Sequence, residues 1–171
     1  MTIRPARDDD WPRIGVLAEE LVRTHHGFDA RRFIHPDTLR ADAYVSHLRA
    51  DVRAGHAVVL IAERAGTLVG YVFAGVEPES RKELRGEAGY IHDLVVDQPQ
   101  RETGVGRALL SSAIDWFDAR GIARVMLWTA PFNERGRHVF ERAGFRQTMI
   151  EMTLDRTPAS VDPQRQRRID A

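Results

Sequence analysis

Apolar residues recur at two different spacings along the chain, and each change of spacing marks a change of predicted element. After the acidic run 8–10, the apolar residues Ile14, Leu17 and Leu21 follow the period of an amphipathic helix, so the pattern predicts a helix over 8–25. A second pattern of this kind predicts a helix over 37–55 that ends at Gly55. The stretch between them, HHGFDARRFIHP, loses the pattern and predicts a loop.

Strand-like runs dominate the middle of the chain. Residues 57–64 and 67–77 are rich in β-branched and aromatic residues on either side of Gly66, which predicts a hairpin. The charged stretch 78–89 predicts a loop. Four further segments have strand-like composition: 2–6, 90–96, 123–129 and 145–154, the last as one strand or a pair. Two more have helical spacing: 105–120, closed by Gly121, and 133–144.

The order strand, helix, strand from 90 to 129 predicts a βαβ crossover. Its two strands should be parallel and the connection right-handed. After about residue 155 the sequence has little to bury, so we predict one domain over 1–155 and a flexible tail over 156–171.

Composition narrows the class of protein. The 171 residues are 43% hydrophobic and 29% charged, which is typical of a globular domain. Basic and acidic residues number 25 each, and this balance gives no electrostatic case for a nucleic-acid or membrane partner. The absence of cysteine excludes disulfides, thiolate metal sites and a cysteine nucleophile. No run of about 18 apolar residues occurs, and the first residues lack the apolar core of a signal peptide, so we expect a cytoplasmic location.

The first candidate functional motif is RETGVGRALL, residues 101–110, where two glycines lie at the start of the helix of the crossover. A helix N-terminus presents unpaired N–H groups and partial positive charge, which suit a phosphate. Glycine lets the backbone approach an anion closely, and Arg101 can add a charge-assisted bond. Alternatively, Gly104 and Gly106 only shape a tight turn. No GxxxxGK string is present, and Leu109 stands where a dinucleotide fingerprint needs a third glycine.

The stretch VVDQPQRETGVGRALL resembles the acyl-CoA signature of the GNAT superfamily of N-acetyltransferases. A second block, NERGRHVFERAGF, and the opening IRPARDDDWPRI are also similar to this family, and the resemblance covers roughly 2–154. It implies an α/β (α+β) fold in which a mixed central sheet of about six to seven strands is flanked by about four helices, with a splayed parallel pair in the middle. It also implies acetyl-CoA as co-substrate, no metal, and an amine acceptor that is a small molecule or peptide. Similar proteins are often dimers, so a homodimer is compatible with it.

The resemblance assigns the cofactor site residue by residue. The splayed strand end would bond the pantetheine arm, and the glycine turn would hold the pyrophosphate. Asn133 and Phe140 would contact the arm and the thioester. The implied set is Leu94, Val95, Val96, Arg101, Glu102, Thr103, Gly104, Val105, Gly106, Arg107, Asn133 and Phe140.

Acetyl transfer needs a neutral amine, whereas an alkyl amine is about one part in a thousand neutral at pH 7, so a base is required. His92 is our first candidate, because strand alternation places it on one face with Tyr90 and Leu94, and a histidine titrates near neutral pH. Similar spermidine and serotonin acetyltransferases carry Glu and His at this position. Asp93 is the second candidate and is expected on the opposite face, where it could also hold a neighbouring element.

One position departs from the family pattern. Many members place a tyrosine, as acid for the departing thiolate, where this chain has Phe140. Either water assists the thiolate, or another group such as Tyr90 supplies the proton. Phe140 also keeps alternatives open: a CoA-binding regulatory or sensor module with impaired catalysis, or an acyltransferase for a longer acyl group or a hydroxyl acceptor. The loops 25–36 and 78–88 are expected to border the acceptor pocket. Four aromatic residues are expected in the core: Trp116, Phe117, Trp128 and Phe132.

Overall fold

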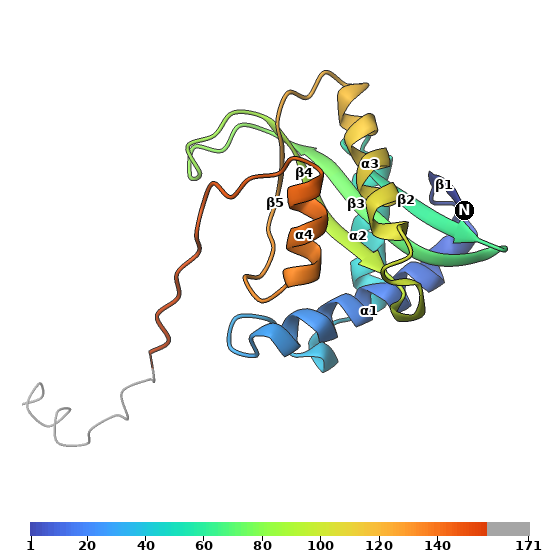
Figure 1. Cartoon of the computed structure of the whole chain (residues 1–171), viewed down its shortest axis with the longest axis horizontal. Helices are drawn as coiled ribbons and strands as arrows, with labels where there is room; N and C mark the ends of the chain where they lie inside the picture. Colours follow the sequence, from blue (N-terminus) through green and yellow to red (C-terminus); the bar gives the residue numbers. More distant parts are fainter. Residues whose placement is uncertain (157–171) are drawn as a thin grey trace, which may run out of the picture.

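The computed structural model describes residues 1–156, in which five strands form one mixed sheet in the order β1-β2-β3-β4-β5 (Figure 1). The neighbours from β1 to β4 pair antiparallel, and β4 and β5 pair parallel, as the hairpin and crossover predictions required. The strands are β1 Thr2–Pro5, β2 Ala57–Arg64, β3 Thr67–Glu77, β4 Ala88–Val96 and β5 Val125–Leu127.

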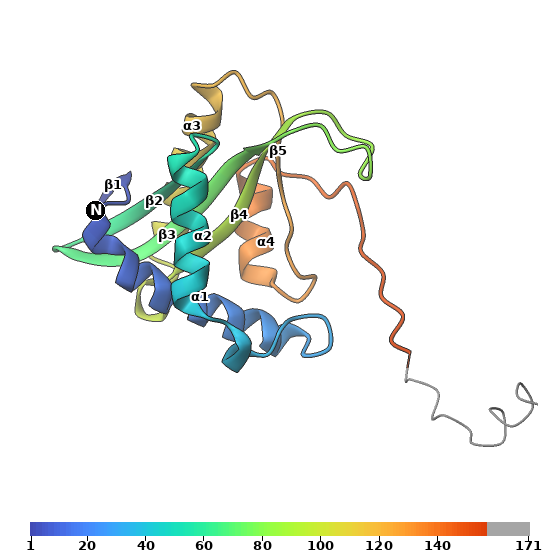
Figure 2. The same ribbon diagram turned by 180° about the vertical axis from the view of Figure 1, so that it is seen from behind.

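Helices cover both faces of the sheet. Two of them, α1 Trp11–Phe28 and α2 Ala41–Arg53, lie on one face (Figure 2). The other two, α3 Val105–Asp118 and α4 Glu134–Arg142, lie on the opposite face (Figure 1). The predicted loop at 25–36 begins later than expected. The helix α1 continues to Phe28, and the ring of His25 packs against Phe28 and Phe33 in this extra turn. None of the helices in residues 1–156 combines the length and apolar character needed to cross a membrane.

The core consists of two layers, one on each face of the sheet. In β2, Leu60 and Ala62 pack in the layer under α3, while Val59 and Ile61 pack in the layer under α1 and α2. This alternation follows from the two-residue period of a strand. Because both faces are covered, β2 and β3 are nearly continuous apolar runs, which explains why they were recognisable in the sequence.

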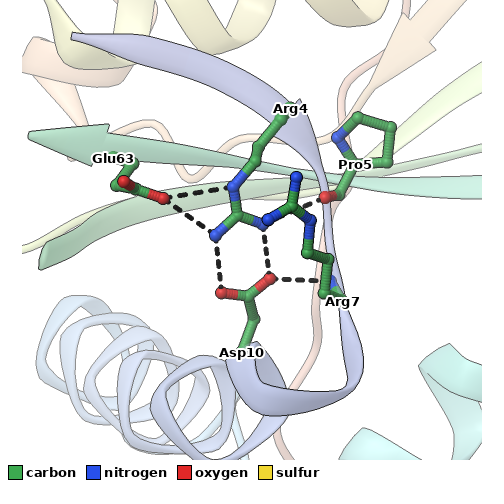
Figure 3. A network of polar contacts seen from close by, with 5 residues as sticks. All are labelled: Arg4, Pro5, Arg7, Asp10 and Glu63. Atoms are coloured by element: carbon green, nitrogen blue, oxygen red, sulfur yellow. Dashed lines mark hydrogen bonds and ion pairs between the residues drawn. The ribbon is translucent and has the colours of Figure 1, made fainter. Parts of the chain in front are cut away.

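A closed polar network joins β1, β2 and the start of α1 (Figure 3). Arg4 donates to Asp10 Oδ2 at 2.7 Å, to Asp10 Oδ1 at 3.0 Å, and to Glu63 Oε2 from Nε at 3.1 Å and Nη2 at 2.9 Å. The backbone N–H of Arg7 donates to Asp10 Oδ2 at 2.6 Å. Each carboxylate therefore has a cationic or N–H partner within the chain.

Two details of the predicted sheet are wrong. The sheet has five strands in the described residues rather than about six to seven, and the parallel pair lies at its edge rather than in its middle. Both differences have one cause, which is that residues 146–156 form no strand. This segment runs away from β5 (Figure 1), so its backbone has no ladder partner and its apolar side chains are exposed: Met149, Ile150, Met152 and Leu154. Apart from Arg156, the predicted tail 156–171 lies outside the described residues.

Candidate active site

The parallel pair β4–β5 opens after three pairs of residues. Gly89, Tyr90 and Ile91 pair with Val125–Leu127, and beyond this point β4 pairs with β3 alone. The predicted cofactor residues Leu94, Val95 and Val96 lie in this open half of β4. Toward β5, their stretch of backbone has no strand partner in the described part of the chain. Peptide groups at such an edge need partners, so the opening can accept an amide-rich ligand.

The predicted phosphate turn lies beside this opening, at the N-terminus of α3. Gly104 has φ 87°, a left-handed conformation that favours glycine, and α3 begins at Val105. The N–H of Ala108 donates to the carbonyl of Gly104 at 3.1 Å, so the N–H groups of 105–107 precede the first helical hydrogen bond. At Gly106 an added Cβ would meet only Val96 Cγ2, at 3.5 Å, so packing within the chain does not require a glycine there.

Side chains of the turn are tied to other elements. Arg101 donates from Nε to the carbonyl of Val96 at 3.1 Å and from Nη2 to Glu20 Oε1 on α1 at 2.7 Å. Thr103 Oγ1 donates to the carbonyl of Gln100 at 2.7 Å. Glu102 has φ 65°, and Glu102 and Arg107 are exposed. Arg101 therefore fixes the turn against β4 and α1.

The two predicted residues of α4 have structural contacts. Asn133 caps the helix: its Oδ1 accepts from the N–H of Gly136 at 3.1 Å, and its Nδ2 donates to Thr129 Oγ1 at 3.2 Å. Phe140 packs in the α3-face layer with its ring centroid 6.1 Å from that of Phe145. Both residues position α4 next to β5, and a cofactor contact by either one remains a prediction.

A β-bulge at His92 changes which side chains of β4 share a face. Phe73 pairs with Asp93 and Ala74 pairs with Ile91, so His92 is the extra residue. His92 stacks on Phe73 and Tyr90, with ring centroids 4.9 Å and 5.2 Å away. Asp93 lies on the same face as His92, and Leu94 packs on the α3 face. We predicted that Asp93 lies on the face opposite His92 and that Leu94 shares the face of His92. Both predictions are wrong, because simple alternation does not allow for a bulge.

Asp93 is a buried carboxylate that anchors α2 to the sheet. Its Oδ2 accepts from the hydroxyl of Tyr44 at 2.6 Å and from that of Tyr71 at 2.8 Å. Burial raises the pKa of Asp93, although the hydrogen bonds from Tyr44 and Tyr71 partly oppose this. A side chain so enclosed suits an anchoring role better than proton transfer with an acceptor.

His92 instead borders a cavity. Its side chain is 31% exposed, and its Nε2 lies 3.7 Å from Glu77 Oε1. Burial lowers the pKa of His92, and the nearby carboxylates, Glu77 first, only partly oppose this. The imidazole is therefore neutral at pH 7 and can accept a proton.

The cavity beside His92 has a volume of about 220 Å³. His92, which stacks on Phe73 of the α1/α2 layer, places the cavity toward this face of the sheet. Its walls combine two carboxylates, three aromatic rings and one aliphatic side chain: Glu77, Glu83, Tyr90, His92, Trp128 and Ile91. Of the predicted bordering segments, the loop 78–88 contributes Glu83.

Sequence reasoning missed several of these residues. Trp128 was expected in the core but is 70% exposed, and Phe132 is exposed as well, whereas Phe117 is fully buried as expected. Arg85 was overlooked although its side chain is only 8% exposed, and it donates to Glu77 Oε2 at 2.5 Å and Glu83 Oε2 at 2.6 Å. A usable signal existed for Glu77 in the sequence, because it is a carboxylate at the end of a buried apolar strand, where the sheet meets a loop.

Comparison with known proteins agrees with this arrangement. A family model described as "Acetyltransferase (GNAT) family" matches residues 19–145. A mycothiol acetyltransferase from Cellulomonas flavigena is 30% identical over 167 residues, which cover 91% of this chain and 42% of the relative. The chain thus spans less than half the length of that curated relative.

Solved structures show the same fold. A mutant form of a Bacillus halodurans protein superposes with a TM-score of 0.78 at 23% identity, covering 91% of this chain and 99% of its own. A predicted acetyltransferase from Clostridium acetobutylicum, solved with acetyl-CoA, superposes with a TM-score of 0.70 at 17% identity over 90% of this chain and 95% of its own.

Proposed function

Because the chain belongs to the acetyltransferase (GNAT) family, we propose that it transfers an acetyl group from acetyl-CoA to a primary amine of a small molecule or peptide. The observation that carries this proposal is the opening of the β4–β5 pair after Ile91, next to the N-terminus of α3 and to His92. One place thus offers unpaired backbone, an anion site and a neutral base.

Coenzyme A binds, in this proposal, along the open edge of β4. The pantetheine amides bond to the backbone of Leu94–Val96, and the pyrophosphate lies over the turn from Arg101 to Arg107. The backbone N–H groups at the start of α3 supply most of the contacts, as the geometry of Gly104 and Gly106 supports. The guanidinium of Arg101 keeps the turn in place through Glu20.

The acetyl group moves directly from sulfur to nitrogen in a ternary complex. His92 takes the proton from the ammonium, and the neutral amine then attacks the thioester carbon. A backbone N–H of open β4 donates to the carbonyl oxygen as it gains negative charge. As the C–N bond forms and the C–S bond breaks, the nitrogen passes its second surplus proton through water to the departing sulfur, and coenzyme A leaves as the thiol. Phe140 has no proton to give, but a thiol pKa of about 8.5 makes departure with the help of water feasible at neutral pH.

Calorimetry with coenzyme A, followed by a free-thiol assay with acetyl-CoA and a panel of amines, tests this function. We expect uptake of one coenzyme and turnover with at least one amine. His92→Ala should retain coenzyme binding but lose about 100-fold or more in kcat. His47→Ala is a matched control, since His47 lies on the same face, 6.5 Å from Phe73, and is more exposed.

The pH profile sharpens the test. With its pKa lowered by burial, His92 should lose its proton below the usual value of about 6.5, so the rate rises through the acidic range and levels off by about pH 7. Coenzyme uptake without turnover on a broad panel would favour the sensor alternative, which Phe140 supports. No uptake at all would refute the assignment.

A further inference from the structure

One buried hydroxyl in the acceptor cavity has no partner. Tyr90 is 6% exposed, and among residues 1–156 its Oη is the buried side-chain polar atom without a hydrogen bond. Leaving such a group unpaired is unfavourable, so its position needs an explanation. The ring is stacked on His92 and is nearly perpendicular to the ring of Trp128, whose centroid is 5.9 Å away. Tyr90 lines the cavity, so a ligand that enters it comes next to this side chain, whose hydroxyl exposes almost no surface in the free protein.

Two carboxylates of the same cavity are held with one oxygen available each. The buried Arg85 guanidinium donates to Glu77 Oε2 and Glu83 Oε2, and also to the carbonyls of Pro78 at 2.9 Å and Gly86 at 3.3 Å. In the described part of the chain, neither Glu77 Oε1 nor Glu83 Oε1 takes part in a hydrogen bond. With His92 neutral, two carboxylates and one guanidinium leave this wall with a net negative charge.

A cation satisfies all of these groups together. An ammonium donates three hydrogen bonds, which suit the two carboxylate oxygens and the lone pair of the Tyr90 hydroxyl. The exposed indole of Trp128 also lines this cavity, and an indole ring is a favourable partner for a cation. The cavity of about 220 Å³ is smaller than a pocket for a drug-sized molecule, so its occupant is a small aliphatic group.

We propose that the acceptor carries two positive charges. One amine reacts at His92, while a second ammonium, on a short aliphatic linker, binds Glu77, Glu83, Tyr90 and Trp128. This assignment rests on the proposed function and adds the acceptor class to it.

The test compares three primary amines of similar length at saturating acetyl-CoA in the free-thiol assay. Putrescine has a second cation, n-butylamine has none, and γ-aminobutyrate has an anion in its place. We expect kcat/KM for putrescine to exceed that of n-butylamine by about tenfold or more, as for one charge-assisted contact, and γ-aminobutyrate to be the poorest. Glu83→Gln should raise KM for putrescine about tenfold and leave n-butylamine unchanged. Glu79→Gln, on the same loop but outside the cavity wall, should change neither.

Tyr90→Phe provides a second measurement that does not depend on turnover. Removing an unpaired buried hydroxyl should raise the melting temperature by about 2–4 °C while weakening putrescine binding to the CoA-loaded protein. A lower melting temperature would mean that the hydroxyl already has a partner in the free protein.

The outcomes separate the two proposals. Equal kcat/KM for putrescine and n-butylamine, or an equal effect of Glu83→Gln on both, overturns the dicationic acceptor and leaves acetyl transfer intact. The dicationic acceptor is also overturned, with acetyl transfer intact, if the protein neither binds nor acetylates putrescine but does bind and acetylate another amine. Loss of coenzyme binding itself would refute the proposed function instead.

Discussion

At the β1–β2 end of the sheet, Arg4 joins Asp10 and Glu63 in a network whose charges are paired within the chain (Figure 3). At the β4–β5 end, the N–H groups that open α3, the free edge of β4 and the hydroxyl of Tyr90 have no such partners in the described residues. Both ends are polar, but the charged side chains of the first are paired within the chain, whereas the second combines an unpaired helix start with a buried hydroxyl that has no partner among residues 1–156. The first end therefore stabilises the fold, and the second is where we propose that a ligand binds.

Two carboxylates show the contrast at the level of single side chains. The guanidinium of Arg4 lowers the pKa of Asp10, which stays ionised in a nearly buried position. Asp93 has only tyrosine hydroxyls as direct partners, and burial raises its pKa. A buried carboxylate therefore does not by itself indicate function, because its partners determine whether its charge is stabilised.

The largest effect on stability should come from Asp93. Asp93→Ala removes the acceptor of two buried hydroxyls, and we expect it to lower the free energy of unfolding by about 3 kcal/mol in urea denaturation. Tyr44→Phe loses only one of these bonds and should cost about 1 kcal/mol. If Asp93 were instead the catalytic base, Asp93→Asn would abolish turnover in a protein of nearly normal stability, and His92→Ala would not.

Asp10 and Asp93 should also give stability opposite dependences on pH. Since the folded pKa of Asp10 is lowered, its contribution is present above the unfolded value of about 3.9 and is lost as the pH falls through the folded pKa. At pH 7 Asp10→Asn should cost about 1–2 kcal/mol, and the difference from wild type should shrink in acid.

For Asp93 the sign is reversed. Its folded pKa is raised, so its contribution is present below about pH 3.9 and declines as the pH rises through the folded pKa. The difference between wild type and Asp93→Asn should therefore shrink toward neutral pH. If the stability differences of the Asp10 and Asp93 variants from wild type changed with pH in the same direction, the proposed contrast between the two carboxylates would be wrong.

Periodicity and local signals predicted much of the fold. The continuous apolar runs of β2 and β3 and the glycine that closes their hairpin were visible because both faces of the sheet are buried. The turn that opens α3 was visible because Gly104 needs a left-handed φ. Long-range features were not visible. The bulge at His92 depends on the register between β3 and β4, and the buried pairing of Asp93 depends on where α2 docks.

The cavity beside His92 could not be predicted for the same reason. Its walls come from the end of β3, the following loop, β4 and the residue after β5, which meet only once the sheet is formed. The final strand or pair at 145–154 was predicted from its strand-like composition, and composition shows only that a segment is able to pair. It does not provide the partner strand.

The two glycines of the phosphate turn separate fold from ligand binding. Gly106→Ala should leave stability unchanged or slightly higher, because the added methyl meets only Val96 and alanine favours a helix. The same methyl would lie where the backbone approaches the pyrophosphate, so we expect calorimetry to show about tenfold weaker coenzyme A binding, or about 1.4 kcal/mol. Gly104→Ala is the complementary control and should destabilise by about 1–2 kcal/mol through its left-handed φ. Unchanged coenzyme affinity in Gly106→Ala would place the anion elsewhere.

The smallest effect is expected in the segment 146–156, which belongs to neither end of the sheet. Ile150 is 73% exposed in this extended segment, which is tied to the body by ion pairs from Arg32 to Glu151 and from Arg31 to Asp155. A side chain with so little buried area contributes little, so Ile150→Ser should change the free energy of unfolding by less than about 0.5 kcal/mol. The buried Ile91 of β4 is the matched control, and Ile91→Val should cost about 1 kcal/mol. A loss in Ile150→Ser as large as that in Ile91→Val would mean that the segment pairs with β5 in solution. The parallel pair β4–β5 would then lie inside the sheet rather than at its edge, as the resemblance implied.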